Sequence, residues 1–164
     1  MMVVAVGLAS VAFAQPGAAN PVPASCCPAG VNFRVRRTAT PPAVQAEPGS
    51  ALVYFVAEDE GSLVEHTILA GVDGHWVGAT HGNSWFYFRI TPGAHHLCAL
   101  ANPGGDALKA LVHFTAEAGG VYYFEARDIT HYRADWTEMT LLPLDSDEGQ
   151  YLISTKEFGA AKKR

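Results

Sequence analysis

Positive charge is scarce in this chain. Its 164 residues include 11 Lys and Arg against 16 Asp and Glu, which gives a formal net charge of −5. This balance argues against proteins that bind nucleic acid or anionic membranes through bulk electrostatic attraction. The two basic clusters, 34–37 and 162–164, are therefore interpreted as solvated surface and a frayed chain end. The sequence predicts no nucleic-acid partner.

Recognisable catalytic and cofactor motifs are also missing. The seven histidines include no HxxxH or HExxH spacing, no GxSxG motif is present, and no glycine-rich phosphate loop precedes a helix. His81 could meet His95 or His96, but adjacent strand residues point to opposite faces, so only one of that pair could join a site. The acidic runs 58–60 and 145–148 are interpreted as a charged loop and a helix start. We predict no catalytic residues, no metal site and no cofactor, and therefore no enzyme.

A long apolar run is absent, which argues against an integral membrane protein. Residues 1–14, MMVVAVGLASVAFA, are uncharged and almost wholly apolar or small, but a membrane-spanning helix needs about 20 apolar residues. They end in Ala12-Phe13-Ala14, the small-x-small pattern that signal peptidase requires, although no Lys or Arg precedes them. We predict a signal peptide cleaved after Ala14 and a periplasmic or secreted protein.

Cysteine is rare, and export would give the three cysteines a structural meaning. Cys26 and Cys27 lie in residues 15–30, a flexible leader rich in Pro and Ala, whereas Cys98 lies in a predicted strand. In an oxidising compartment we expect one disulfide and one remaining thiol. We predict that Cys98 pairs with Cys26 or Cys27, closing a loop of about 70 residues and tying the leader to the sheet.

The adjacent pair Cys26-Cys27 has other interpretations. It could link two molecules, bind a soft metal ion or carry a lipid. The residues before Cys26, Pro23-Ala24-Ser25, include no apolar residue at the usual position of a lipid-attachment signal. This departure argues against lipid anchoring.

The sequence is rich in short β-strand patterns separated by turn residues. The continuous apolar run 51–56 is typical of a central strand buried on both faces. Asp73-Gly74 predicts a two-residue hairpin, because both residues accept positive φ. Further strands are predicted at 31–35, 67–72, 76–78, 84–90, 95–100, 111–115, 121–127 and 136–144.

These strands predict an all-β fold, an antiparallel β-sandwich of about seven to nine strands over residues 31–158. The spacing between strands is too short for the helices of parallel crossovers. One short C-terminal helix is predicted at 146–155, where Asp145 can act as its N-cap and Glu148 as the reciprocal member of a capping box. A basic tail, 159–164, follows.

The aromatic strand 84–90 offers the best candidate for ligand binding. Alternation places apolar residues on one face, which should be the core, and Trp85, Tyr87 and Arg89 on the other. Flat, amphipathic side chains on that face could stack against a sugar ring or a peptide, with Trp76 and Tyr123 extending the platform. Alternatively, the C-terminal helix or a loop covers this face and Trp85 is simply buried.

A series of motifs in residues 48–154 resembles an uncharacterised family of exported bacterial proteins, a domain of unknown function related in shape to PEGA-type surface modules. The matching segments are PGSALVY (48–54), GVDG with WVG (71–78), GNSWFYF (82–88), PGAHHLC (92–98), AGGVYYF (118–124) and DSDEG (145–149). The resemblance implies a small antiparallel β-sandwich in the cell envelope, with no catalytic residues to carry over. Many members of the family look like lipoproteins, a pattern from which this chain departs.

Taken together, the sequence predicts a non-enzymatic structural or interaction module of the cell envelope, with an envelope protein or a glycan as its partner. The alternative is a glycan- or peptide-binding module. Its site would comprise Trp85, Tyr87, Arg89 and Trp76.

Overall fold

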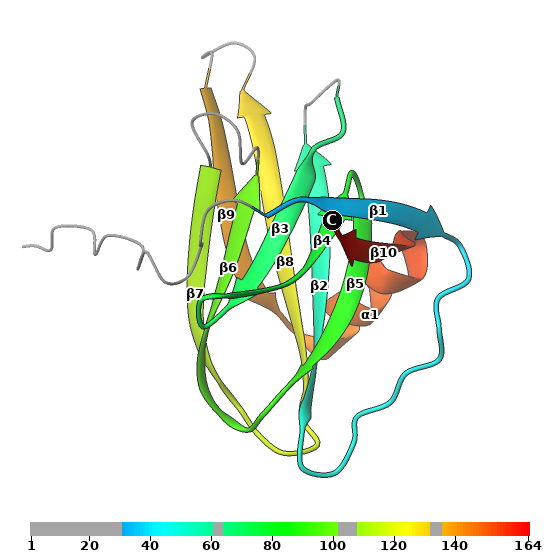
Figure 1. The fold of residues 1–164 in the computed structure, drawn as a ribbon, viewed down its shortest axis with the longest axis vertical. Coiled ribbons are helices and arrows are strands. Elements are labelled where there is room, and N and C mark those ends of the chain that lie inside the picture. The colour runs from blue at the N-terminus through cyan, green and yellow to red at the C-terminus, as the bar shows by residue number, and fades with distance from the viewer. Residues whose placement is uncertain (1–30, 61–63, 102–107, 132–135) are drawn as a thin grey trace, which may run out of the picture.

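The computed structural model describes residues 31–60, 64–101, 108–131 and 136–164, which form two β-sheets and one helix (Figure 1). The six-stranded sheet has the order β1-β10-β5-β2-β8-β9, and the four-stranded sheet has the order β4-β3-β6-β7. The six-stranded sheet comprises β1 (Phe33–Thr38), β10 (Glu157–Lys163), β5 (Ser84–Ile90), β2 (Ala51–Glu60), β8 (Val121–His131) and β9 (Trp136–Leu144). The four-stranded sheet comprises β4 (His75–His81), β3 (Thr67–Val72), β6 (Gly93–Ala101) and β7 (Leu108–Ala116).

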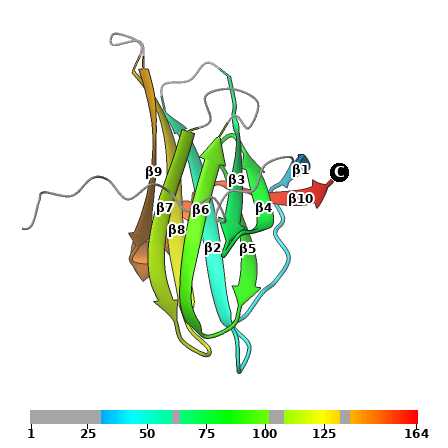
Figure 2. The same ribbon diagram turned by 60° about the vertical axis from the view of Figure 1, so that its left-hand side comes forward.

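The two sheets pack face to face, as the turned view in Figure 2 shows. The all-β sandwich predicted from the sequence is confirmed, with ten strands in the described residues. The main core lies between the sheets and is built from alternate residues of their strands, including Phe55, Phe86, Leu97 and Phe124. Strand β2 is central, and its residues 51–57 are all buried, as the continuous apolar run predicted.

The sandwich is mostly antiparallel, as predicted, but it contains two parallel pairs of strands. Strand β2 pairs with β8 in parallel, and β10 pairs in parallel with β5 through Glu157–Ser84 and Phe158–Trp85. No crossover helix is needed between β2 and β8, because the chain passes through the four-stranded sheet before it returns to β8. The short spacing between strands excludes parallel pairing only for strands that follow one another in the chain, and β2 and β8 do not.

The hairpin and the helix were predicted correctly. Asp73 and Gly74 have φ of 48° and 81°, as a two-residue turn with two left-handed positions requires. Helix α1 (Ser146–Thr155) begins after Asp145, whose side chain accepts a hydrogen bond from the Glu148 backbone N–H at 2.8 Å. None of the helical structure in the described residues is long and apolar enough to cross a bilayer.

The prediction of a basic tail at 159–164 was wrong. Residues 157–163 form β10, which pairs antiparallel with β1 along its whole length, from Phe33–Lys163 to Thr38–Phe158. The backbone N–H of Arg164 continues this ladder by donating to the Asn32 carbonyl at 2.9 Å. The alternation of Phe158 with small and basic residues fits a strand with one buried face, but the charge content of the segment suggested a solvated end.

Candidate functional site

The amphipathic face of β5 is covered. Trp85 is 4% exposed and packs with Leu52, Tyr54 and Tyr123 in a second core on the outer side of the six-stranded sheet. Helix α1 contributes Leu152 and Ile153 to this core, and the segment before β2 contributes Val44 and Ala46. The Trp85 indole N–H donates to the Lys156 carbonyl at 3.1 Å. The structure therefore matches the alternative in which Trp85 is simply buried.

The four residues of the predicted ligand site do not form one surface. Arg89 is exposed but engaged, since Nη2 donates to the Gln45 carbonyl at 3.1 Å and lies 2.9 Å from Glu47 Oε1. Trp76 belongs to β4 and packs in a third cluster at the other sheet. Tyr87 is partly buried and lines a groove of about 310 Å³ with residues of β4 and β10. Tyr87 is thus the residue of the predicted set that lines this groove.

The histidines predicted to approach each other lie apart. His81 Nδ1 is 3.1 Å from the Thr67 hydroxyl and Nε2 is 3.6 Å from Glu65, whereas His95 contacts Asp73. His95 and His96 do point to opposite faces, because His95 is buried beside Phe114 and His96 is exposed. These positions bring no His–His site together between β4 and β6.

Asp73 and His95 form a tight ion pair at the hairpin. His95 Nδ1 is 2.6 Å from Asp73 Oδ2, and Nε2 is 2.8 Å from the Thr91 carbonyl oxygen, so both ring nitrogens donate, as in an imidazolium. Burial alone would lower the pKa of His95, but the hydrogen bonds to Asp73 and Thr91 outweigh burial and raise it. Burial alone would raise the pKa of Asp73, but donors from His96 and His95 lower it. All of these groups are satisfied, which fits a role in holding the turn.

A pair of carboxylates lies on the outer side of the six-stranded sheet. Burial, and then the neighbouring Glu58, raise the pKa of Glu125, while Arg127 opposes the shift. Arg127 Nε is 2.7 Å from Glu125 and 3.7 Å from Glu58, and Lys156 Nζ is 3.5 Å from Glu58. Two cations therefore balance two acids in this cluster.

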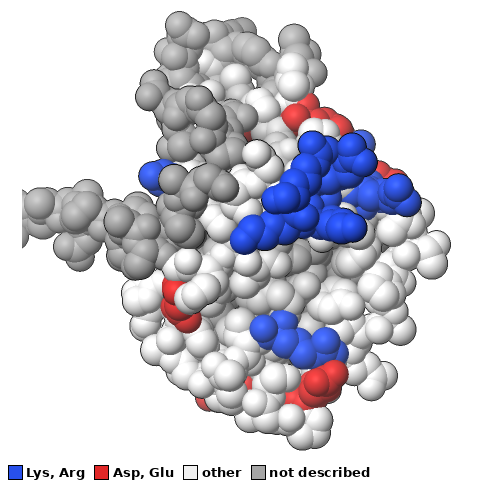
Figure 3. Space-filling view, in the orientation of Figure 1, with Lys and Arg blue, Asp and Glu red and all other residues white. Residues whose placement is uncertain are grey.

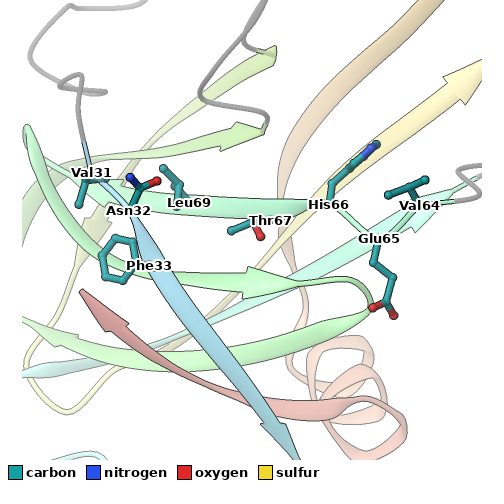
Figure 4. Close-up of a pocket in the computed structure, with 8 residues that line it drawn as sticks. All are labelled: Val31, Asn32, Phe33, Val64, Glu65, His66, Thr67 and Leu69. Atoms are coloured by element: carbon teal, nitrogen blue, oxygen red, sulfur yellow. The ribbon is translucent and has the colours of Figure 1, made fainter. Parts of the chain in front are cut away.

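A groove with a volume of about 390 Å³ lies between the start of β1 and the start of β3 (Figure 4). Its walls mix apolar residues such as Val31 and Leu69 with polar ones. In Figure 4 the imidazole of His66 and the carboxylate of Glu65 point in different directions. These two titratable groups thus do not converge on the groove as acid–base partners.

The feature that stands out at the surface is a strip of cations on β1 and β10, which we call the basic strip. It consists of Arg34, Arg36, Lys162 and Arg164. Arg34 lies opposite Lys162 in the ladder, and strand alternation puts all four side chains on the same, outward face. All four residues are exposed, and Figure 3 shows the blue side chains gathered over β1 and β10.

The inward face of the same two strands explains why the strip is held in place. Phe33, Val35 and Ala161 pack in the third cluster, with Leu69 and Trp76 of the four-stranded sheet. Arg37 is separately engaged, 2.6 Å from Glu65 and 3.5 Å from Glu157. Among the described residues, no ion pair involves a side chain of the basic strip. Within the described part of the chain, the strip is thus an unpaired line of positive charge on two strands that pair with each other.

Both basic clusters are visible in the sequence, but their pairing in one sheet was not predicted. They are separated by most of the chain, and an overall net charge of −5 suggested that neither mattered. The signal that was available is the alternation of 31–36 and of 158–164, in which charged residues follow a two-residue period. That period predicts two strands with a basic face, although not that they pair.

Cys98 is fully buried in β6. Its predicted partners, Cys26 and Cys27, lie outside the described residues, as do the predicted signal peptide and leader. The disulfide and the cleavage site therefore stay predictions.

Comparisons with protein-family models, with curated proteins and with solved structures give no match. The resemblance to an exported family of unknown function thus stays a prediction that rests on the motifs quoted above.

Proposed function

We propose that this chain is a non-enzymatic interaction module of the bacterial cell envelope, and that its basic strip binds an anionic envelope polysaccharide. The observation that carries the proposal is that the pairing of β1 with β10 brings basic residues from two distant parts of the sequence onto one exposed face. Six of the 11 Lys and Arg residues lie at 34–37 and 162–164. All 16 acidic residues and the other five cationic residues lie outside these two clusters. Positive charge is therefore concentrated in these two clusters, and the exposed face that carries the basic strip would orient an anionic partner.

The shape of the strip favours an extended polymer over a small anion. Residues two apart along a strand are about 6.6 Å apart, so Arg34 and Arg36 present charges in a line and do not converge on a point. A small anion needs several donors aimed at one centre. A chain of regularly spaced phosphate, sulfate or carboxylate groups can instead pair with successive cations along β1 and β10.

The surroundings of the strip favour a polysaccharide over a lipid surface. Proteins that bind at a membrane surface usually add apolar side chains that enter the headgroup region. The large apolar residues that are exposed in the described part of the chain are Val64, Val121, Leu142 and Tyr151, and none of them belongs to β1 or β10. The predicted signal peptide at 1–14 supports the envelope location.

A binding assay with dextran sulfate as the anionic probe tests this proposal, with neutral dextran as the comparison. The wild-type chain should bind dextran sulfate, more weakly as salt rises, and should ignore neutral dextran. The variant R34E/R36E/K162E should lose at least about tenfold in affinity, whereas K109E, which reverses one exposed charge on β7, should bind within about twofold of wild type. Equal affinity of wild type and the triple variant would refute the proposal.

The Tyr87 groove supports a second candidate function. Its walls combine Tyr87, Phe86 and Phe158 with the small residues Gly159 and Ala160, and aromatic walls of this kind suit the apolar face of a sugar ring. Titration of tryptophan fluorescence with neutral cell-wall glycans tests it, because Trp85 lies directly against Phe158. An unchanged spectrum, or equal affinity after Tyr87→Ala, would reject this candidate.

A further inference from the structure

Two carboxylates and one imidazole, from Asp59, Asp128 and His66, meet at one end of the sandwich. Asp59 of β2 and Asp128 of β8 are direct partners in the parallel ladder, so their side chains lie on the same face. That face is the inner one, since Ala57 and Ala126, two residues earlier in each strand, belong to the main core. His66 precedes β3 and reaches this pair from the other sheet.

The contacts within this cluster are short. His66 Nδ1 lies 2.6 Å from Asp128 Oδ2, and the His66 backbone N–H donates to Asp59 Oδ2 at 2.9 Å. One ligand atom from each of the three residues lies within 4.8 Å of the other two. The side chain of Asp128 is fully buried and that of His66 is 21% exposed.

The cluster leaves buried acceptors unused. Asp59 Oδ1 and Asp128 Oδ1 are inaccessible to solvent, and within the described part of the chain neither has a hydrogen-bond partner. A buried carboxylate oxygen without a partner is costly. Among the described residues, His66 is the one basic side chain in contact with Asp128, so the cluster is also poor in positive charge.

The Asp73–His95 pair shows what a purely structural Asp–His contact looks like in this same molecule. Its distance is also 2.6 Å, but Asp73 Oδ1 accepts from the His96 backbone N–H at 2.8 Å and the residue is exposed. Every polar atom of that pair is satisfied. The cluster of Asp59, His66 and Asp128 differs from this pair because it has a second carboxylate, is more deeply buried and contains two carboxylate oxygens without a partner.

We infer that Asp59, His66 and Asp128 form a binding site for a divalent first-row transition-metal ion of the Zn²⁺ class. A mixed set of one imidazole nitrogen and two carboxylates suits such ions, whereas Mg²⁺ and Ca²⁺ prefer oxygen ligands alone. The ion replaces the proton on His66 Nδ1, which is released to solvent, and it uses the unpartnered carboxylate oxygens. Since the ligands come from β2, β8 and the start of β3, the ion would clamp the two sheets together at this end.

The site was missed in the sequence because its three ligands have no motif spacing. Asp59 lies in an acidic run, and Asp128 lies beyond the predicted end of its strand at 127. Only the β2–β8 register places Asp59 beside Asp128.

Zinc binding by the full chain, after removal of metal with a chelator, tests the inference. Isothermal titration with Zn²⁺ should show one site, and Mg²⁺ should give no heat under the same conditions. Saturating Zn²⁺ should raise the melting temperature of the wild type, because a ligand that binds only the folded state stabilises it. D59N and D128N should each lose at least about tenfold in zinc affinity.

A control variant and a second ligand variant separate loss of the metal site from loss of folding. D73N is the matched control, since it makes the same change in the other Asp–His pair, and it should bind zinc like the wild type. If D128N fails to fold, H66Q provides the second variant, and bound Co²⁺ should lose its visible ligand-field absorption in H66Q. Absence of zinc binding in the wild type, or unchanged binding in D59N and H66Q, would overturn the inference; dextran sulfate binding would be unaffected in either case.

Discussion

At the scale of single residues, the ion pair between Asp73 and His95 makes the hairpin dependent on pH. The pKa of His95 is raised above 6.5, so its stabilisation is complete below the unfolded value and is lost as pH rises through the folded value. The pKa of Asp73 is lowered below 3.8, so its stabilisation is present above 3.8 and is lost as pH falls through the folded value. The pair therefore stabilises the fold most between about pH 4 and 6.5.

We predict that His95→Gln lowers the free energy of unfolding by about 1 kcal/mol at pH 5, a value that allows for solvent screening of the exposed Asp73. The difference from wild type should shrink between pH 5 and pH 9, as the pH rises through the raised pKa of His95. Urea unfolding followed by tryptophan fluorescence at both pH values measures it. Lys109→Gln, at an exposed position on β7 away from the hairpin, should match the wild type. A difference that grows with pH would contradict the assignment.

The residue scale also shows where sequence reasoning stops. The division of strand 84–90 into a core face and an amphipathic face was correct, because alternation is a local property of the backbone. Whether Trp85 was open to solvent could not be predicted. Its cover comes from Val44, Leu152 and Phe158, which are far away in the sequence and reach Trp85 only through tertiary packing.

At the scale of elements, helix α1 depends on one glycine. Gly149 is buried within the helix, and a Cβ added there would overlap the ring of Tyr123. Helix propensity alone predicts that Gly149→Ala stabilises the protein by about 1 kcal/mol. The packing predicts the opposite sign.

We therefore predict that Gly149→Ala lowers the free energy of unfolding by about 1–3 kcal/mol, as overpacking usually does. Chemical denaturation measures the difference. Ser154→Ala, at an exposed position of the same helix, should change stability by less than about 0.5 kcal/mol. A stabilised Gly149→Ala variant would show that α1 does not dock closely on β8.

Strand β10 provides the second prediction at this scale. Phe158 lies with its ring centroid 5.1 Å from Trp85 and 5.9 Å from Tyr87. Phe158→Ala should cost about 2–3 kcal/mol, somewhat less than a fully buried phenylalanine, and should shift Trp85 emission to longer wavelength. Ala160→Ser, on the exposed face of β10, is the control and should be close to neutral. A neutral Phe158→Ala would support the frayed end that the charges suggested.

Element prediction succeeded where the signals were local. The predicted bounds of the helix, the hairpin and strand 84–90 agree with α1, the Asp73–Gly74 turn and β5. Strands β2 and β8 continue beyond their predicted ends into charged residues such as Asp59 and Asp128, because cross-strand pairing extends them. Parallel pairing and β10 were missed because both depend on partners distant in the chain.

At the scale of the whole molecule, the predicted disulfide would tie the N-terminal leader to the four-stranded sheet. Leu100 packs with Val31 on the outer face of that sheet, and Cys98 lies two residues away on the same face. Four residues before Val31, Cys27 is within about 14 Å of it along an extended chain. The geometry of the described residues is therefore compatible with the bridge.

We predict that Cys98 of the exported protein is linked to Cys26 or Cys27. Removing the bridge by Cys98→Ala should lower the free energy of unfolding by about 2–5 kcal/mol. Peptide mass spectrometry without reduction identifies the link. A reduced Cys98 in the exported protein would contradict the bridge and weaken the case for the envelope.

The central claim, that the basic strip is the interaction surface, is tested most directly by mapping the bound polymer. Two-dimensional amide NMR of the ¹⁵N-labelled protein during titration with dextran sulfate should shift resonances of β1 and β10, above all Arg34, Arg36 and Lys162, in a way that added salt reverses. Resonances of β7 around Lys109 should stay in place. Shifts that cluster around the Tyr87 groove or elsewhere, with β1 and β10 unchanged, would contradict the account.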